Sequence, residues 1–103
     1  MITMYGSRIC IDCRNFLALM ASRKLEKEFQ LVDITENTTN MKRFLTLRDH
    51  QPVFAGVRTR EPESGIGIPA FQKEDGTLTL SEDEALSWIG QPPMTEAEHV
   101  EKR

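Results

Sequence analysis

Cys10 and Cys13 are the residues of this chain whose types and spacing most clearly indicate chemistry. They are separated by two residues and are the only cysteines among 103 residues, so any sulfur chemistry takes place here. The C-x-x-C spacing is typical of redox-active dithiols, and it also supplies half of a tetrahedral zinc site. A dithiol that cycles with a disulfide is the first interpretation, and a metal site is the second.

The cysteine pair stands where a predicted strand gives way to a predicted helix. Residues 1–5 alternate apolar with polar side chains, residues 6–7 interrupt that pattern, and an apolar stripe then predicts a helix over 11–26. Cys10 falls near the N-cap, where unpaired N–H groups and the positive end of the helix dipole stabilise an anion. We therefore expect Cys10 to be the thiolate nucleophile. Cys13, one turn further on the stripe that faces the core, is its expected disulfide partner.

The next elements complete a β-α-β unit and add a second helix. Residues 29–34 have the near-continuous apolar character of a strand buried on both faces, which predicts a parallel pair with a right-handed crossover. Candidate caps at 37–39 begin a helix that runs to about residue 49. In residues 50–67, Pro52 begins a short helix that an exposed loop follows.

The second half of the chain predicts a hairpin and a last helix. Strands over 68–73 and 77–80 flank Asp75-Gly76, a strong signal for an antiparallel hairpin. Residues 81–84 match a capping box, and Gly90 closes the helix that follows. We expect one α/β domain over residues 1–90, with a four-stranded mixed sheet flanked by helices in the order β-α-β-α-β-β-α. Residues 91–103 form a polar C-terminal tail, for which we expect a frayed helix or disorder.

Composition excludes several classes of function. The chain is 39% hydrophobic and 28% charged, and its net charge of −3 comes from 13 basic and 16 acidic residues without a basic stripe, which argues against nucleic acid as a partner. No apolar run approaches the about 20 residues of a membrane-spanning helix, and Met1 leads into strand-like sequence and not into a signal peptide. We expect a cytoplasmic monomer that does not bind membranes. In a reducing compartment, a lone C-x-x-C is more often catalytic or metal-binding than structural.

This order of elements, with C-x-x-C opening the first helix and Ile68-Pro69 opening the third strand, resembles the glutaredoxin branch of the thioredoxin-fold family. The resemblance covers roughly residues 1–90. Its strongest parts are residues 4–7, which lead into the cysteine pair, residues 32–34 in the second strand, and residues 67–71 at the start of the third strand. The resemblance implies a thioredoxin-like fold and a glutaredoxin-type thiol-disulfide oxidoreductase.

The resemblance also implies roles for residues outside the cysteine pair. Pro69 would have a cis peptide bond facing the cysteines, and the backbone of Ile68 would hydrogen-bond an incoming disulfide or glutathione. Asp83 keeps the acidic residue that holds the glutathione amino group in this family. We also expect Arg8 to contribute to substrate binding. Two loop arginines, Arg58 and Arg60, could hold a glutathione carboxylate.

The chain departs from the family pattern at three places. Ile11-Asp12 stands where typical dithiol glutaredoxins have Pro-Tyr, so a negative charge lies beside the nucleophile and competes with Arg8, Arg14 and the helix dipole. Leu80-Ser81 replaces the glycine pair that usually precedes the acidic residue, and the 50–67 segment is longer than usual. The expected reaction is reduction of protein disulfides or glutathione mixed disulfides, with glutathione as co-substrate, disulfide-containing proteins as partners and no metal.

Three alternatives remain open from the sequence. The first is a glutaredoxin-like electron donor that thioredoxin reductase recharges. The second is a glutathione-assisted iron-sulfur cluster protein or a zinc-binding protein, in which His50, His99 or carboxylates complete the ligands. The third is an interaction module in which the C-x-x-C is inert.

Overall fold

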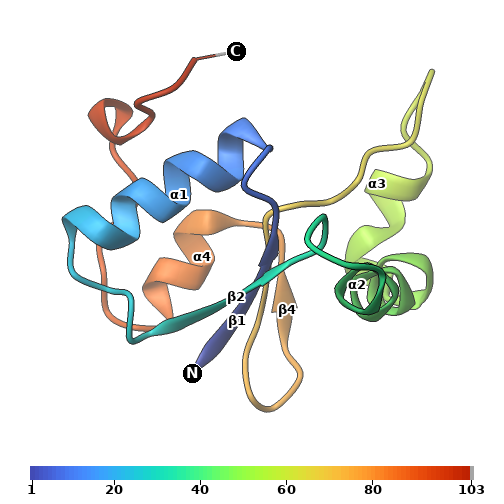
Figure 1. Cartoon of the computed structure of the whole chain (residues 1–103), viewed down its shortest axis with the longest axis horizontal. Helices are drawn as coiled ribbons and strands as arrows, with labels where there is room; N and C mark the ends of the chain where they lie inside the picture. The colour runs from blue at the N-terminus through green and yellow to red at the C-terminus, as the bar shows by residue number, and fades with distance from the viewer. Residues whose placement is uncertain (103) are drawn as a thin grey trace.

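The computed structural model describes residues 1–102 and has helices on both faces of a central sheet (Figure 1). In chain order its elements are β1 Ile2–Gly6, α1 Ile11–Ser22, β2 Phe29–Asp33, α2 Thr38–His50, the 3-10 helix η1 Pro52–Phe54, α3 Ala55–Arg58, β3 Ala70–Gln72, β4 Leu78–Thr79, α4 Glu82–Ser87 and the 3-10 helix η2 Glu96–Glu98. Within residues 1–102, no helix has the length and apolar character needed to span a membrane.

The sheet is mixed, with the strand order β2-β1-β3-β4. Strand β1 is parallel to β2, whereas β3 is antiparallel to both β1 and β4. The predicted α/β class, the four-stranded mixed sheet and the parallel β-α-β unit are therefore confirmed for the described residues. The register pairs Gly6 with Asp33, so the carboxyl ends of β1 and β2 meet at one edge of the sheet, where the chain turns into α1.

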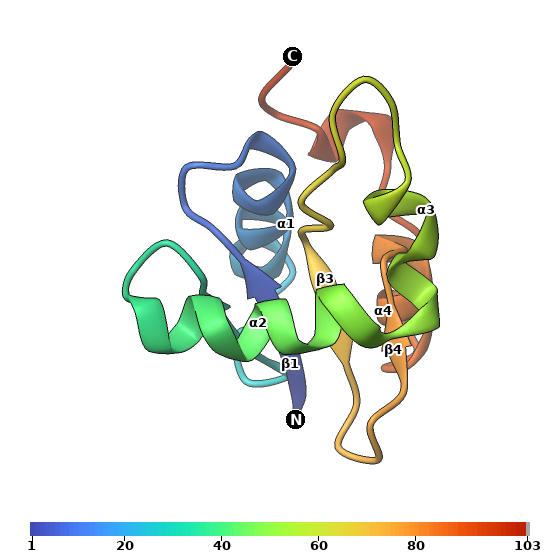
Figure 2. The ribbon, with the colours of Figure 1, turned by 90° about the vertical axis from the view of Figure 1, so that its right-hand side faces the viewer.

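The alternation of side chains along the strands divides the core into two halves. On one face α1 and α4 pack around Met4 and Phe71, and on the other face α2 and η1 pack around Tyr5 and Ala70 (Figure 2). Aromatic rings join the layers, and the centroids of Phe16 and Phe71 lie 4.8 Å apart. Burying apolar surface on both faces is what a sheet with a parallel strand pair requires.

Helix α1 ends four residues earlier than the sequence predicts. Lys24 has a φ of 58°, and the N–H of Leu25 donates to the carbonyl of Met20 at 2.8 Å while that of Lys24 donates to Ala21 at 3.2 Å. These two bonds form a Schellman motif, with the buried Leu25 as its apolar contact. The sequence has no glycine at this position to mark the end of the helix, so its pattern predicts a helix up to residue 26.

The hairpin and the last helix are shorter than predicted but lie where the sequence puts them. Gly76 has a φ of 95° in the turn, and the Ser81 hydroxyl caps α4 by accepting the N–H of Glu84 at 3.1 Å. The second half of the capping box is replaced, because Thr79 Oγ1 donates to the Glu84 carboxylate and accepts the N–H of Ser81. Ser81 is therefore the N-cap as predicted, but the Glu84 carboxylate accepts from the Thr79 hydroxyl and not from the Ser81 N–H.

Residues 50–67 contain the predicted short helix and an exposed loop. Pro52 stands in the first turn of η1, and Phe54 is fully buried between α2 and the sheet. The Arg58 guanidinium donates to the carbonyls of Arg48 and Gln51 at 2.7 and 3.0 Å. Arg58 therefore closes the C-terminal end of α2.

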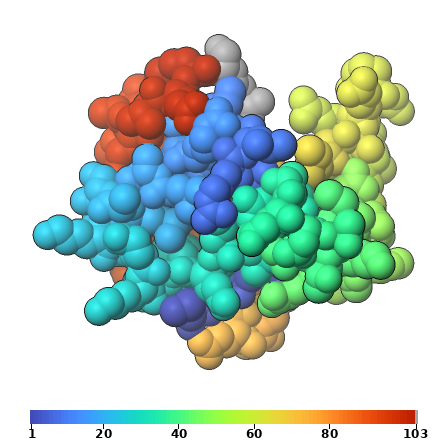
Figure 3. Space-filling model, in the orientation of Figure 1, coloured from blue at the N-terminus to red at the C-terminus, as the bar shows by residue number. Residues whose placement is uncertain are grey.

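The C-terminal segment, residues 91–102, differs from the expected frayed helix or disorder. It forms η2 and lies against the outer side of α1, as the red atoms over the blue helix show in Figure 3. Arg23, at the C-cap of α1, makes two hydrogen bonds to the Glu98 carboxylate and donates to the carbonyls of Pro92 and Pro93. These partners are 69 to 75 residues apart, a separation that local sequence patterns do not report.

Candidate thiol site

Cys10 is the N-cap residue of α1, as the sequence predicts. Its φ and ψ of −95° and 127° are extended, its N–H donates to the Ser7 carbonyl at 3.1 Å, and its own carbonyl accepts the N–H of Arg14 at 2.9 Å. The half-buried Cys10 thiol thus stands at the positive end of the helix dipole. A thiolate is electrostatically favoured at such a position.

Cys13 lies one turn further along α1 and is fully buried. It packs against the backbone of β1, because a Cβ placed on Gly6 would lie 3.0 Å from the Cys13 sulfur. Burial raises the pKa of the Cys13 thiol, and the adjacent Cys10 raises it further, whereas a backbone hydrogen bond from Ser7 lowers it. The two free thiols therefore differ in exposure, since Cys10 is half-buried and Cys13 is fully buried.

Cys10 opens into a cavity of about 580 Å³ between the loop before α1, the end of β2, α3 and the segment before β3. Most of its wall is aliphatic or glycine, and Arg60 is the one charged residue in the lining set: Ser7, Ile9, Cys10, Ile34, Thr35, Gly56, Val57, Arg60, Gly65, Ile66, Gly67 and Ile68. Ile9 is 76% exposed and Ile66 59% exposed. The cavity is therefore apolar up to its rim.

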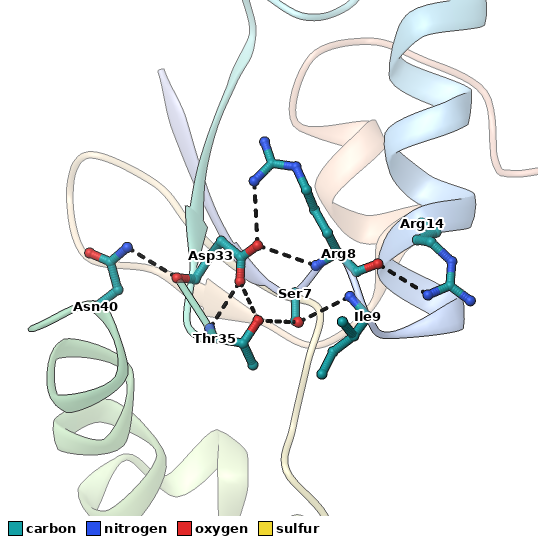
Figure 4. Close-up of polar contacts among 7 residues, drawn as sticks. All are labelled: Ser7, Arg8, Ile9, Arg14, Asp33, Thr35 and Asn40. Carbon is teal, nitrogen blue, oxygen red and sulfur yellow. Dashed lines mark hydrogen bonds and ion pairs between the residues drawn. The ribbon is translucent and has the colours of Figure 1, made fainter. Parts of the chain in front are cut away.

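A chain of hydrogen bonds ties the loop before Cys10 to the end of β2 (Figure 4). The N–H of Ile9 donates to the Ser7 hydroxyl at 3.2 Å, Ser7 and Thr35 hydroxyls lie 2.6 Å apart, and Thr35 Oγ1 donates to Asp33 at 2.7 Å. Because the single Thr35 hydroxyl proton goes to Asp33, the Ser7 hydroxyl must be the donor to Thr35. The chain thus runs in one direction and ends at a carboxylate, which strengthens each bond.

Asp33 anchors this network. Its side chain is 7% exposed and pairs with the Arg8 guanidinium at 3.3 Å, and it also accepts the N–H groups of Thr35 and Arg8. Burial by itself raises the pKa of the Asp33 carboxyl, but the hydrogen bonds from Thr35 and Arg8 outweigh it and hold the pKa below its usual value. The sequence pattern predicts no role for Asp33. The signal that marks it is a carboxylate at the end of a strand in which Gln30 is the one other polar residue.

The structure brings together some of the predicted site residues and separates others. Ile68 lines the cavity with Cys10, and the Ile68–Pro69 bond is cis, as the resemblance implies. Arg60 also lines the cavity. Arg8 does not line it, since its guanidinium is turned to Asp33.

Asp83 lies away from the cavity that Cys10 lines. Its Oδ1 accepts the N–H of Met94 at 2.9 Å, and it borders a separate small cleft with Ser81, Glu82 and His99. Here Asp83 serves to attach the C-terminal segment to α4. The described residues include no group of three or more His, Cys, Asp or Glu side chains that could hold a metal ion.

The geometry is thus that of an accessible thiol and a buried thiol beside an apolar cavity. Comparisons with protein-family models, curated proteins and solved structures give no match. The functional argument therefore depends on the residues of this chain.

Gly67 sets the shape of the cavity wall. It has a φ of 96°, and a Cβ there would lie 2.9 Å from Cδ1 and Cε1 of the buried Phe54 ring. Gly67→Ala is expected to lower the free energy of unfolding by about 1–3 kcal/mol, because the new methyl group meets both strain and overlap. Urea denaturation measures this loss.

Gly56→Ala is the matched control, since Gly56 lines the same cavity but its added Cβ would meet no described atom within 4 Å apart from its chain neighbours and the backbone of its own helix. Gly56 is in α3, so alanine should leave stability unchanged or raise it by up to about 1 kcal/mol. Equal urea midpoints for the two variants would contradict the argument.

Proposed function

We propose that this protein is a thiol-disulfide oxidoreductase of glutaredoxin type with a thioredoxin-like fold. The observation that carries the proposal is the position of Cys10 at the start of α1, open to a cavity, with the buried Cys13 one turn behind it. The arrangement of strands in the mixed sheet and the Ile68–Pro69 segment beside Cys10 support the same proposal. Its partners would be disulfide-containing proteins and glutathione in a reducing compartment.

The reaction begins when the Cys10 thiolate attacks one sulfur of a substrate disulfide. A new S–S bond forms to Cys10 and the other substrate sulfur leaves as a thiolate, which takes up a proton. The Cys13 thiol then loses its proton and attacks the Cys10 sulfur, which releases the second substrate thiolate and forms the Cys10–Cys13 disulfide. Two electrons have then passed from the dithiol to the substrate. An outside thiol reductant restores the dithiol.

Glutathione fits part of this site. The cavity volume lies in the range of small-molecule sites, and Arg60 can offer paired hydrogen bonds to a carboxylate of the tripeptide. Asp83, which the resemblance assigns to the glutathione amino group, is bonded to Met94 and lies outside the cavity. Glutathione would therefore bind here without Asp83 as the partner of its amino group.

A second candidate is a dithiol electron donor that thioredoxin reductase recharges. The position of Asp83 and the aliphatic cavity wall favour it, since an apolar surface beside the nucleophile suits a protein disulfide better than it suits a charged tripeptide. The chemistry of Cys10 and Cys13 is the same in both candidates. They differ in the molecule that reduces the Cys10–Cys13 disulfide.

The test is turnover of two substrates, a small glutathione mixed disulfide and an insulin-type protein disulfide, with each of two reducing systems. One system contains glutathione, glutathione reductase and NADPH, and the other contains thioredoxin reductase and NADPH. We expect NADPH consumption that depends on the protein in at least one system. Turnover with glutathione supports the first candidate, and turnover with thioredoxin reductase alone supports the second. No turnover in either system would overturn the proposed function.

A further inference from the structure

The C-terminal segment reaches the first turn of α1, next to the cysteine pair. Arg14 donates from Nε and Nη2 to the two carboxylate oxygens of Glu101 at 2.7 and 2.8 Å. The adjacent Asn15, which is 2% exposed, donates to the Glu101 carbonyl at 3.0 Å and accepts its N–H at 2.9 Å. Glu101 is thus held at both its backbone and its side chain, although 87 residues separate it from Arg14.

Arg14 in turn contacts the loop that presents Cys10. Its third donor group, Nη1, donates to the Arg8 carbonyl at 3.1 Å, as Figure 4 shows. Arg14 directly follows Cys13 in α1 and lies near enough to both sulfurs for its charge to interact with them. The orientation of one guanidinium therefore affects both the backbone next to Cys10 and the charge at the two thiols.

We propose that Glu101 is a positioning residue of the thiol site, because its carboxylate orients Arg14 against the Arg8 carbonyl and offsets the Arg14 charge beside the two sulfurs. This inference rests on the proposed function, in which the Cys10 thiolate is the nucleophile. Glu101 does not contact the sulfurs itself. The C-terminal segment is then a part of the redox site and not an appendage to it.

The sign of the effect follows from the charges around the pair. Removing the Glu101 charge leaves the Arg14 charge without its partner, and a cation without a partner favours a nearby thiolate more strongly. The other charges that face this region are the same in both proteins. They are Asp12 on α1, Arg8 in the preceding loop with its partner Asp33, Arg60 in the cavity lining, and Glu82 on α4, whose carboxyl interacts with Asp12, Asp83 and His99. We expect Glu101→Gln to move the midpoint of the Cys10 alkylation profile to lower pH by about half a pH unit.

The experiment measures the rate at which iodoacetamide alkylates Cys10 as a function of pH, with mass spectrometry to identify the modified cysteine. Glu98→Gln is the matched control, because Glu98 makes the same two-bond pair with Arg23 at 2.9 and 2.6 Å. Arg23 comes nine residues after Arg14, roughly 13 Å along the helix, which exceeds the Debye length of about 8 Å at physiological salt. Both variants keep the backbone bonds to Asn15.

The expected result is a shift in Glu101→Gln, none in Glu98→Gln, and a return toward the wild-type midpoint in Glu101→Asp. The shift should shrink in 1 M salt, because the Debye length is then only about 3 Å. A wild-type profile in Glu101→Gln, or an equal shift in Glu98→Gln, would overturn the inference. The profile needs no disulfide substrate, so it is measured whether or not the protein shows turnover. A protein without turnover but with the Glu101-specific shift would contradict the proposed function alone.

Discussion

Replacing Cys10 with serine is expected to lower disulfide reduction by at least about a thousandfold, to the uncatalysed background. Serine has no sulfur and cannot form the mixed disulfide, and within the described residues the sole other thiol, Cys13, is fully buried. The measurement is NADPH-coupled turnover of a protein disulfide with the reducing system that supports the wild type. Equal activity of the wild type and Cys10→Ser would contradict the assignment of the nucleophile.

Cys13→Ser is the matched partner of that variant, and the expected result is different. Cys10 can still form a mixed disulfide, so a glutathione thiol can resolve it, and glutathione-dependent turnover should persist. Reduction of protein disulfides without glutathione should be lost. Cys13 supplies the resolving thiol, and the described residues contain no other cysteine besides Cys10 that could replace it. Loss of the glutathione-dependent reaction in Cys13→Ser would contradict this division of roles.

Asp33→Asn is expected to lower both the stability of the protein and its rate of disulfide reduction. At pH 7 it should lower the free energy of unfolding by about 1.5–3 kcal/mol, the usual contribution of hydrogen bonds to a buried charged group. The carboxylate accepts bonds from Thr35 and Arg8 at the edge of the sheet where Ser7 leads into α1. Urea denaturation measures the loss, and kcat/KM for disulfide reduction should fall with it because the Cys10 loop loosens.

The pH dependence of this loss separates the charge from the shape of the side chain. The native pKa of Asp33 is lowered, so its contribution is complete above the unfolded-state value of about 3.9 and is lost as the pH falls through the native value. The difference between wild type and Asp33→Asn should therefore be constant near neutral pH and shrink below about pH 4. Asp49→Asn, at an exposed carboxylate on α2, is the control. An equal loss in both variants would contradict the role of Asp33.

The sequence predicts the elements of this fold because each carries its own local signal. The apolar run of β2, the turn at Asp75-Gly76 and the caps at Asn37 and Ser81 all lie where the pattern puts them. The end of α1 is different, because Lys24 takes a left-handed conformation that sequence patterns assign to glycine. The end of α2 at His50 and the turn at Gly90 after α4 do follow the local pattern, so the end of α1 is the one that differs among these three helices.

The candidate site is predictable in part, for the same reason. The positions of Cys10 and Cys13 follow from helix periodicity, but the partners of Arg58 and Asp83 depend on how distant segments pack. Arg58 donates hydrogen bonds to carbonyls at the end of α2, and Asp83 accepts the N–H of Met94. In each case a polar side chain that could bind a ligand satisfies the backbone of its own chain instead. Neither a motif nor a charge count distinguishes these two uses.

The pair between Arg14 and Glu101 also has a consequence for the order in which the chain is made. The 87 residues that separate the two take a ribosome roughly 4–17 seconds to add at about 5–20 residues per second. Strand β2 ends at Asp33, 19 residues after Arg14, so for most of that interval the residues of the β1-α1-β2 unit have all been added while Arg14 has no carboxylate from the C-terminal segment. The nascent protein therefore presents both thiols before the contact that orients Arg14 beside them exists, and only the completed chain has the charge balance of the native site.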